Sequence, residues 1–358
     1  MKKVLVWLSG WVDSAVSAYL LKKQGYDVVA WFMVNYRDPE NPNCQTRIDK
    51  IEAKKVADFL GIEFRVFDYV EQYEQKVLNY MYEWYRKWIT PNPDIMCNSE
   101  VKFKIFLEEA LNLGFDYVAM WHYARIKPSP QTSPLKEREF KLLKWIDNNK
   151  DQSYFLAGLS QNQLSKALFP IWELEKSEVR KIANEIWLPN ANRKDSQWIC
   201  FVWKVNMADF LEKKIKPKKW LVKDTSWNIL WEHKWVFYYT IGQRKWIDIW
   251  GQSEAIFVVK KDLEKNEIIM WKTLDLELYS NKLIMNNINY LNSEYKDKQN
   301  FKAKSKIRYR QADQECEIFK QENWEYRVEF SEKQRAVASG QICAIYMDDE
   351  LIMSGVIS

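Results

Sequence analysis

The amino-acid sequence predicts an α/β fold, with a doubly wound parallel sheet in the N-terminal part and two smaller β-rich domains after it. The first part alternates short apolar, β-branched runs with segments of helical period, which is typical of a parallel sheet covered by helices. After about residue 205 the apolar segments become short and alternate with polar residues, as antiparallel strands do. We therefore expect three domains, over residues 1–204, 205–272 and 273–358.

Glycines and prolines indicate the ends of the elements in the N-terminal domain. Gly25, Gly61 and Gly114 each follow a segment of helical period, where a helix commonly ends. The predicted strands cover residues 4–6, 28–33, 63–67, 116–120 and 141–143. The predicted helices cover residues 14–23, 46–60, 70–88, 99–113, 161–168 and 177–186, and the predicted loops cover 90–94 and 127–136.

The β-rich part begins after a lysine-rich segment. Residues 213–223 carry six lysines among eleven residues. Such a segment is either a solvated linker, which we favour, or an edge that contacts phosphates. The predicted strands that follow cover residues 235–241, 255–259, 267–271, 305–310, 316–319, 326–330 and 342–347.

The composition is that of a soluble globular protein, with 47% hydrophobic residues, 29% charged residues and a formal net charge of +5. No apolar run reaches the roughly 18 residues that a membrane span needs, and the N-terminus leads into a strand rather than a signal peptide. The five cysteines form no Cys-x-x-Cys pair and are too few for a secreted disulfide framework. We therefore expect a cytoplasmic monomer without a zinc site.

The contents of tryptophan and glycine are unusual. The chain has 19 tryptophans and 9 glycines, whereas glycine alone usually supplies about 7% of a globular chain. Several tryptophans stand where a turn favours glycine, among them Trp11, Trp227 and Trp250. Two explanations are open. The protein is rich in tryptophan, or its gene uses a codon, conventionally read as tryptophan or stop, that is decoded as glycine.

Residues 9–14 join the first predicted strand to the first predicted helix, a position where backbone amides and a helix N-terminus bind phosphate. The loop reads Ser-Gly-Trp-Val-Asp-Ser and lacks the Gly-Lys-Ser/Thr of a Walker loop. Ser9 and Ser14 offer hydroxyl donors, and Asp13 can hold Mg²⁺. With glycine at position 11 the loop resembles the pyrophosphate loop of the ATP-pyrophosphatases, whereas Trp11 would block the approach of phosphates to the amides.

Five further motifs narrow this resemblance to one family. In the order found here they occur in the tRNA-specific 2-thiouridylases, the MnmA/TrmU family, which the chain resembles along its whole length and less specifically after residue 251. The motifs cover residues 91–98, 121–125, 149–156, 195–201 and 239–245. The family pattern has glycine where this chain has Trp7, Trp11, Trp121, Trp172, Trp198, Trp231, Trp246 and Trp250. This coincidence favours recoding over a tryptophan-rich protein.

The resemblance implies that ATP, with Mg²⁺, adenylates the 2-carbonyl oxygen of the wobble uridine in a tRNA, and that sulfur then replaces this oxygen. It implies that Cys200 carries a persulfide received from a sulfur-relay protein or a cysteine desulfurase, and that Cys97 is the nucleophile that attacks it. We also predict that Cys97 lies just before a helix that begins near Ser99, whose dipole would favour the thiolate. Asp94 is the natural general acid or base beside the target base.

The same resemblance implies two sets of binding residues and a tRNA-binding role for the central domain. The ATP site would comprise Trp7, Leu8, Ser9, Gly10, Trp11, Val12, Asp13, Ser14, Met33 and Trp121. The target base and the rest of the tRNA would contact Asn92, Pro93, Asp94, His122, Lys150, Asp151, Gln152, Arg308, Tyr309 and Gln341. Because Lys306, Arg308 and Arg310 alternate along a predicted strand, we expect one face of that strand to be basic.

Two other functions stay open. A catalytically inactive tRNA-binding protein is the preferred interpretation if Trp11 and Trp121 are the native residues. Another PP-loop synthetase, acting on a small molecule, would lack the pair Cys97 and Cys200.

Overall fold

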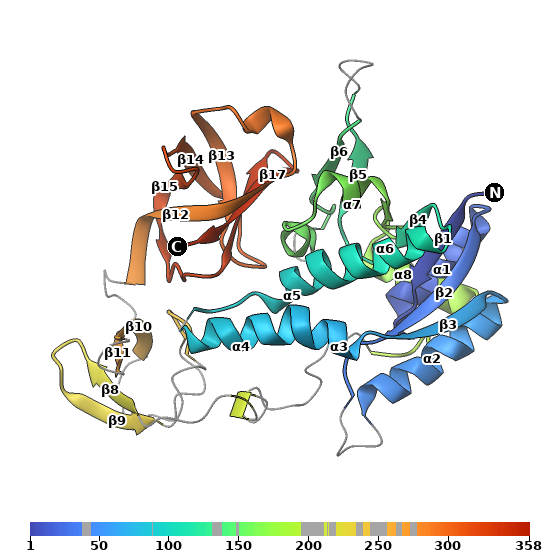
Figure 1. Cartoon of the computed structure of the whole chain (residues 1–358), viewed down its shortest axis with the longest axis horizontal. Helices are drawn as coiled ribbons and strands as arrows, with labels where there is room; N and C mark the ends of the chain where they lie inside the picture. The colour runs from blue at the N-terminus through green and yellow to red at the C-terminus, as the bar shows by residue number, and fades with distance from the viewer. Residues whose placement is uncertain are drawn as a thin grey trace.

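Five parallel strands form the sheet of the N-terminal domain, in the order β3-β2-β1-β4-β7 (Figure 1). The apolar residues of β1, β2 and β4 are buried on both sides, as a sheet covered by helices requires, whereas those of the edge strand β3 are only half-buried or exposed. From β1 the chain continues to β2 and β3 on one side of the sheet, and from β4 it continues to β7 on the other side. The strand order therefore reverses between the neighbours β1 and β4. The strands are β1 (Lys3–Trp7), β2 (Asp27–Val34), β3 (Glu63–Asp68), β4 (Tyr117–Ala119) and β7 (Ala167–Leu168).

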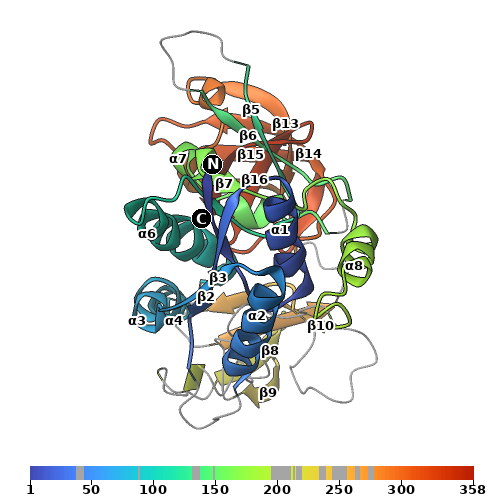
Figure 2. The same cartoon turned by 90° about the vertical axis from the view of Figure 1, so that its right-hand side faces the viewer.

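Helices cover both faces of this sheet (Figure 2). One face packs against α1 (Val12–Lys23), α2 (Gln45–Leu60) and α8 (Lys176–Glu185). The other face packs against two long helical segments. The first consists of α3 (Val70–Tyr73), η1 (Glu74–Leu78) and α4 (Asn79–Arg86), and the second of α5 (Pro93–Met96), η2 (Cys97–Ile105) and α6 (Phe106–Asn112). The doubly wound arrangement predicted from the sequence is confirmed.

The structure is a computed structural model, which describes part of the chain in detail. The described residues are 1–37, 44–87, 89–130, 138–147, 150–194, 211–212, 214, 220–233, 239–243, 256–262, 267–272 and 278–358. Cys200, the whole motif 195–201, and residues 235–238 of a predicted strand lie outside them. Among the described helices, none has the length and apolar character needed to cross a membrane.

Three local predictions for the N-terminal domain are wrong. The helix predicted from residue 99 begins at Pro93, because the Asn92 side chain caps it by accepting a hydrogen bond from the Ile95 amide at 3.3 Å. The helix predicted over 161–168 is α7 (Gln161–Ser165), and the residues after it form β7. The start of the predicted loop 127–136 belongs to β5 (Arg125–Pro128), which pairs with β6 (Phe140–Leu143).

The middle of the chain contains a four-stranded sheet in the order β10-β11-β8-β9. Two of these strands, β10 (Ile256–Asp262) and β11 (Glu267–Lys272), were predicted. The other two strands were not predicted. The end of the lysine-rich segment, which we expected to be a linker, forms β8 (Trp220–Asp224), and β8 pairs with β9 (Ile229–His233). Residues 239–241, expected to end a strand, have no strand structure.

Six antiparallel strands at the C-terminus close into a barrel, since the first strand pairs with the last. The predicted strand over 305–310 is wrong beyond Lys306, because Arg310 has a φ of 64° in the turn that follows. β12 and β17 were not predicted. The strands are β12 (Tyr279–Tyr290), β13 (Asn300–Lys306), β14 (Gln314–Lys320), β15 (Tyr326–Arg335), β16 (Ile342–Met347) and β17 (Glu350–Ile357).

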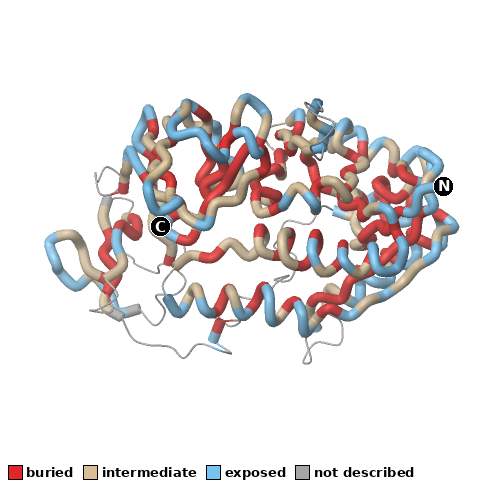
Figure 3. The backbone as a smooth tube through the Cα atoms, turned by 45° about the horizontal axis from the view of Figure 1, so that its top comes forward, coloured by how far each residue is buried: buried red, intermediate tan, exposed pale blue. Residues whose placement is uncertain are grey.

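The barrel and the N-terminal domain share one sheet. Strand β17 pairs with β6, so the hairpin β5–β6 extends the barrel sheet to eight strands. Figure 3 shows buried segments along the parallel strands and along the barrel strands, with exposed segments outside them. This shared sheet holds the barrel beside the carboxyl ends of the parallel strands.

Three tryptophans adopt a backbone conformation that favours glycine. Among the described residues, seven other than glycine have a positive φ, and three of these are Trp187 (60°), Trp227 (67°) and Trp324 (65°). All three side chains are exposed. Trp187 follows Ile186, the C-cap residue of α8. The Leu188 amide bonds to the Ala183 carbonyl at 2.9 Å, which is the Schellman arrangement in which glycine is usual at the position of Trp187. Trp187 was not among the tryptophans that the sequence singled out.

Candidate functional site

The loop between β1 and α1 lies where the strand order of the sheet reverses, the usual ligand site of open α/β sheets. Its two serines fix its shape. The Ser14 hydroxyl accepts hydrogen bonds from the Ser9 amide at 3.2 Å and from the Ser9 hydroxyl at 3.0 Å, and donates to the Trp11 carbonyl at 2.8 Å. The loop therefore closes on itself before α1 begins, with the helix N-terminus beside it.

Gly10 is the position in this loop that no other residue can fill. Its φ is 84°, and a Cβ atom here would overlap the carbonyl oxygen of Asp49 in α2. The Gly10 carbonyl accepts two hydrogen bonds, from Asn190 Nδ2 and from an Arg193 guanidinium nitrogen, both at 2.9 Å. The loop is thus held against α2 and against the segment that precedes residue 195.

Asp13, the predicted Mg²⁺ ligand, is already engaged. Its Oδ1 accepts a hydrogen bond from the Tyr123 hydroxyl at 3.0 Å and forms an ion pair with Lys176 at the start of α8. No group of three potential metal-ligating side chains occurs among the described residues. At a nucleotide site Mg²⁺ needs only one or two carboxylates, since phosphates and water supply the other ligands. One carboxylate beside the loop therefore fits this ion, with Lys176 sharing the charge.

A cavity of about 130 Å³ adjoins the loop at the carboxyl ends of β1, β2 and β4. It brings together five residues that were predicted for the ATP site: Trp7, Ser9, Trp11, Met33 and Trp121. The sequence analysis did not identify the other residues that line the cavity. They come from β2, the segment after it and α2, so they form no motif in the sequence. These residues are Phe32, Asn35, Tyr36, Thr46 and Asp49.

Three indole rings occupy the surroundings of this cavity. The ring centroids of Trp7 and Trp121 are 5.6 Å apart in an edge-to-face arrangement, and the Arg193 guanidinium lies 3.8 Å from the Trp11 ring. Ligand pockets for molecules of nucleotide size usually measure about 300 Å³ or more. The cavity is smaller than that with tryptophan at these three positions, and glycine at the same positions would enlarge it.

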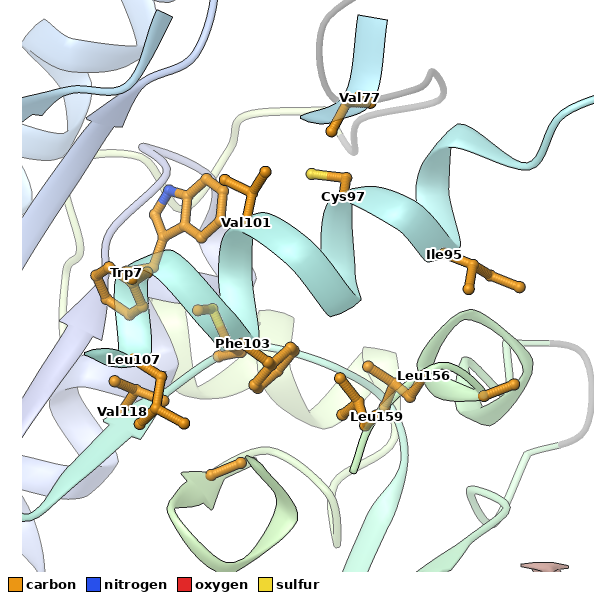
Figure 4. Packing of buried hydrophobic residues seen from close by; sticks show 14 of the residues in the cluster. Trp7, Val77, Ile95, Cys97, Val101, Phe103, Leu107, Val118, Leu156 and Leu159 are labelled. Carbon is orange, nitrogen blue, oxygen red and sulfur yellow. The ribbon is translucent and has the colours of Figure 1, made fainter. Parts of the chain in front are cut away.

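Asp94 and Cys97 lie on the helical segment that begins at Pro93. Burial raises the pKa of the Asp94 carboxyl, and the positive charge of Lys102 opposes this rise. Cys97 is 3% exposed, and Figure 4 shows its side chain below Val77 and one turn before Val101. The prediction that Cys97 precedes a helix N-terminus is wrong, because it follows the first turn of the helix and the dipole effect is confined to that turn.

The segment before Asn92 is held by the C-terminal barrel. The side-chain amide of Gln341 donates hydrogen bonds to the carbonyl oxygens of Thr90 at 2.9 Å and Pro91 at 3.2 Å. Gln341, predicted to contact tRNA, therefore connects the barrel to the segment that carries Asn92 and Pro93.

His122 lies inside an aromatic cluster. Its side chain is 4% exposed, and its ring lies 5.5 Å from Phe169 and 5.7 Å from Phe103. Burial lowers the pKa of His122 well below its ordinary value, so the imidazole is neutral at physiological pH. This burial gives the predicted contact with tRNA no support.

Asp151 and Gln152 bind other parts of the protein. The buried Asp151 carboxylate accepts hydrogen bonds from the Trp145 amide at 3.1 Å and the Ser153 hydroxyl at 2.9 Å. The Gln152 side chain accepts from the Tyr123 amide at 3.0 Å. Lys150 is half-buried. Two of the three residues predicted here for tRNA contact thus shape the protein itself.

The basic strand face predicted around Arg308 is absent. Lys306 is 5% exposed and pairs with Asp151, and the residues after it form a turn. Arg308 donates a hydrogen bond to the Ala336 carbonyl, and the Tyr309 ring lies 4.3 Å from Phe155. Arg308 and Tyr309 are half-buried, and Arg310 is exposed.

Three family models together match most of the chain. They are described as a tRNA methyl transferase HUP domain over residues 2–204, a tRNA methyl transferase PRC-barrel domain over 208–272 and an aminomethyltransferase β-barrel domain over 280–357.

Curated relatives match the chain from end to end. The tRNA-specific 2-thiouridylase MnmA of Lysinibacillus sphaericus is 42% identical over 357 residues, which cover 99% of this chain and 94% of that protein. The protein of the same name from Christiangramia forsetii is 40% identical over 399 aligned positions, which cover 100% of both chains.

Proposed function

Because the chain belongs to the tRNA-specific 2-thiouridylase family, we propose that it is a tRNA-modifying sulfurtransferase that converts a wobble uridine to 2-thiouridine with consumption of ATP. The observation that carries this proposal is the cavity at the carboxyl ends of β1 and β4. It joins the Ser9–Ser14 loop to Met33 and Trp121, and the helical segment with Asp94 and Cys97 lies beside β1.

The first step activates the oxygen that has to leave. The 2-carbonyl oxygen of uracil attacks the α-phosphorus of ATP, and pyrophosphate departs with the electrons of the broken P–O bond. The amides and hydroxyls of the loop, together with the N-terminus of α1, neutralise the phosphate charge. Mg²⁺ beside Asp13 would supply further positive charge for the pyrophosphate.

The second step replaces AMP by sulfur. The terminal sulfur of a persulfide on Cys200 forms the bond to C2 of the base, and AMP leaves with the electrons of the C2–O bond. Attack by the Cys97 thiolate on the Cys200 sulfur, before or after this, frees the transferred sulfur and leaves a Cys97–Cys200 disulfide. A dithiol reductant then restores both thiols. Since Cys97 is 3% exposed, its sulfur has to become accessible when the tRNA binds.

The raised pKa of Asp94 supports its role as a general acid or base. A carboxyl group with a raised pKa exchanges protons more readily near neutral pH than an exposed one does. Asn92 and Pro93, at the start of the same helical segment, would contact the flipped base, whose extrusion from the anticodon loop is needed for chemistry at C2. Lys150, Arg308 and Tyr309 would bind the phosphates and bases around it.

We further propose that the native residue is glycine at Trp7, Trp11 and Trp121. Two independent features support this. The three indoles restrict the cavity to about 130 Å³, and three other tryptophans have the positive φ that glycine adopts most easily. If tryptophan is native at the cavity, its small volume favours the second candidate, an inactive tRNA-binding protein.

The sulfur donor would be a relay protein or a cysteine desulfurase, which passes its persulfide to Cys200. We expect the enzyme to act as a monomer in the cytoplasm, where tRNA and ATP are both present.

Two synthetic genes test the proposed function. One encodes the sequence shown, and the other encodes glycine at the eight family-matched tryptophans. Each protein is incubated with ATP, unmodified tRNA, a cysteine desulfurase with free cysteine as the persulfide donor, and a dithiol reductant, and mass spectrometry of the digested RNA reports 2-thiouridine. We expect the glycine version to be active and its Cys200→Ala variant to be inactive, with Cys44→Ala as the matched control that stays active. If both versions fold and bind tRNA without forming 2-thiouridine, the proposed function is wrong.

A further inference from the structure

Lys102 places a buried positive charge at the edge of the nucleotide cavity. It belongs to η2, and its side chain is 5% exposed. Its ammonium nitrogen lies 5.2 Å from the ring centroid of Trp7 and 5.7 Å from that of Trp121. Both rings line the cavity, at the ends of β1 and β4. The ammonium group therefore lies directly behind the wall that these two rings form.

The same charge acts on Asp94 and His122, two buried residues that do not line the cavity. Asp94 lies eight residues before Lys102 on one helical segment, so both can lie on the same side of that segment. The positive charge of Lys102 opposes the rise that burial causes in the pKa of Asp94, and it adds to the fall that burial causes in the pKa of His122. Lys102 is thus near two rings that line the cavity predicted for ATP, and its charge also reaches the carboxyl predicted to act on the base.

Burying an ammonium group costs free energy, which its surroundings offset. An aromatic face compensates part of the cost, and a phosphate compensates far more. If glycine replaces Trp7 and Trp121, the wall between the ammonium group and the cavity disappears. The charge would then face the cavity where the phosphates of ATP and the target base meet.

We propose that Lys102 is a further catalytic residue, whose ammonium group binds the α-phosphate of ATP during adenylation of the tRNA. This inference rests on the proposed function. As the bond from uracil O2 to the α-phosphorus forms and the bond to pyrophosphate breaks, negative charge grows on the phosphoryl oxygens, and the ammonium group stabilises it. Lys102 keeps its proton throughout, so the atoms and electrons balance as in the adenylation step itself.

The test compares Lys102→Gln with Lys104→Gln in the glycine version of the full chain. Lys104 is the matched control, because it is two residues away, is exposed, and pairs with Glu100 at 3.0 Å on the outside of the same helix. Titration calorimetry without tRNA measures the affinities for ATP and for adenosine. We expect Lys102→Gln to weaken ATP binding by about tenfold or more and to leave adenosine binding unchanged, because only ATP offers a phosphate to the ammonium group.

Rate measurements with tRNA complete the test. Lys102→Gln should slow 2-thiouridine formation at saturating ATP, Lys102→Arg should restore part of the rate, and Lys104→Gln should behave as the parent protein. An unchanged affinity and rate in Lys102→Gln, or equal losses of ATP and adenosine binding, would overturn the assignment. If Lys102→Gln does not fold, Lys102→Arg and Lys102→Met are measured in the same way. If the parent protein itself forms no 2-thiouridine, the proposed function is wrong. The comparison of ATP and adenosine binding then still tests the role of Lys102.

Discussion

The Asp151 carboxylate of the N-terminal domain forms a buried ion pair with the Lys306 ammonium group of the C-terminal barrel, at 3.3 Å. Lys306 also lies 3.7 Å from Asp313, which pairs with Lys144 at 2.5 Å, so charges alternate across the domain boundary. The Tyr346 hydroxyl lies 3.1 Å from the Ser153 hydroxyl beside this network. Because β17 also pairs with β6 nearby, this contact fixes the barrel on the N-terminal domain.

Replacing Asp151 by Asn should destabilise the whole chain. Loss of one partner leaves Lys306 buried with a weaker counter-charge, and breaking such a pair costs about 3 kcal/mol. Thermal unfolding of the variant checks this, with Asp349→Asn as the control, since Asp349 joins the same two domains through Arg125 but is exposed. If Asp151→Asn keeps the stability and weakens only tRNA binding, the carboxylate contacts RNA as the family resemblance implies.

Replacing Asp94 by Asn should remove activity and increase stability at neutral pH. Burial raises the pKa of Asp94 in the folded state. The folded protein therefore loses stability as the pH rises from the ordinary pKa of about 3.8 through the raised value. The amide carries no charge at any of these pH values, so the variant should show a smaller decline in this range.

Parallel measurements decide this prediction. Thermal unfolding between pH 3 and pH 8, at intervals of about one unit, gives the stability, and the thiolation assay gives the rate. We expect a rate loss of about 10² or more, the usual contribution of a general acid or base. A variant with near-normal activity would show that Asp94 moves no proton.

Removing the amide of Gln341 should slow catalysis more than it affects stability. The Gln341 side chain holds the Thr90 and Pro91 carbonyls, which precede the residues proposed to contact the target base. In Gln341→Ala this segment loses two neutral hydrogen bonds, together worth about 1–3 kcal/mol. Steady-state thiolation should show a lower kcat, whereas Asn323→Ala, in an exposed turn of the barrel, should leave it unchanged. Equal kcat values for both variants would contradict this prediction.

Glycine should stabilise the chain at Trp187 and Trp324. A residue with a side chain costs about 1 kcal/mol or more in the left-handed region relative to glycine, and these two side chains are 84% and 68% exposed, so little packing is lost. Thermal unfolding of Trp187→Gly and Trp324→Gly measures the gain. Trp84→Gly is the opposite control, because Trp84 lies inside α4, where glycine destabilises a helix.

Native peptides test the recoding more directly. Mass spectrometry of the protein from its own cell should find glycine at positions 11, 187 and 324. Tryptophan at position 11 would exclude recoding at the loop and favour the inactive tRNA-binding protein.

The sequence by itself determined what local residue patterns specify. The alternation of apolar runs and helical periods identified the parallel strands, because each element buries its own apolar face. The loop from Ser9 to Ser14 was recognisable because all the residue types that a phosphate-binding loop needs stand within six consecutive positions. Met33 and Trp121 came from the resemblance, and the structure places both at the cavity beside this loop.

Only the tertiary structure decided which polar groups meet across long separations in the chain. Asp151 was expected at the surface with tRNA, yet Lys306 and Ser153 bury it, and no local pattern reveals a partner 155 residues away. Lys102 was overlooked because its importance depends on the ends of β1 and β4, which the fold brings to one helix. Sequence patterns record what each segment needs locally, whereas burial and charge pairing depend on the distant segments that pack against it.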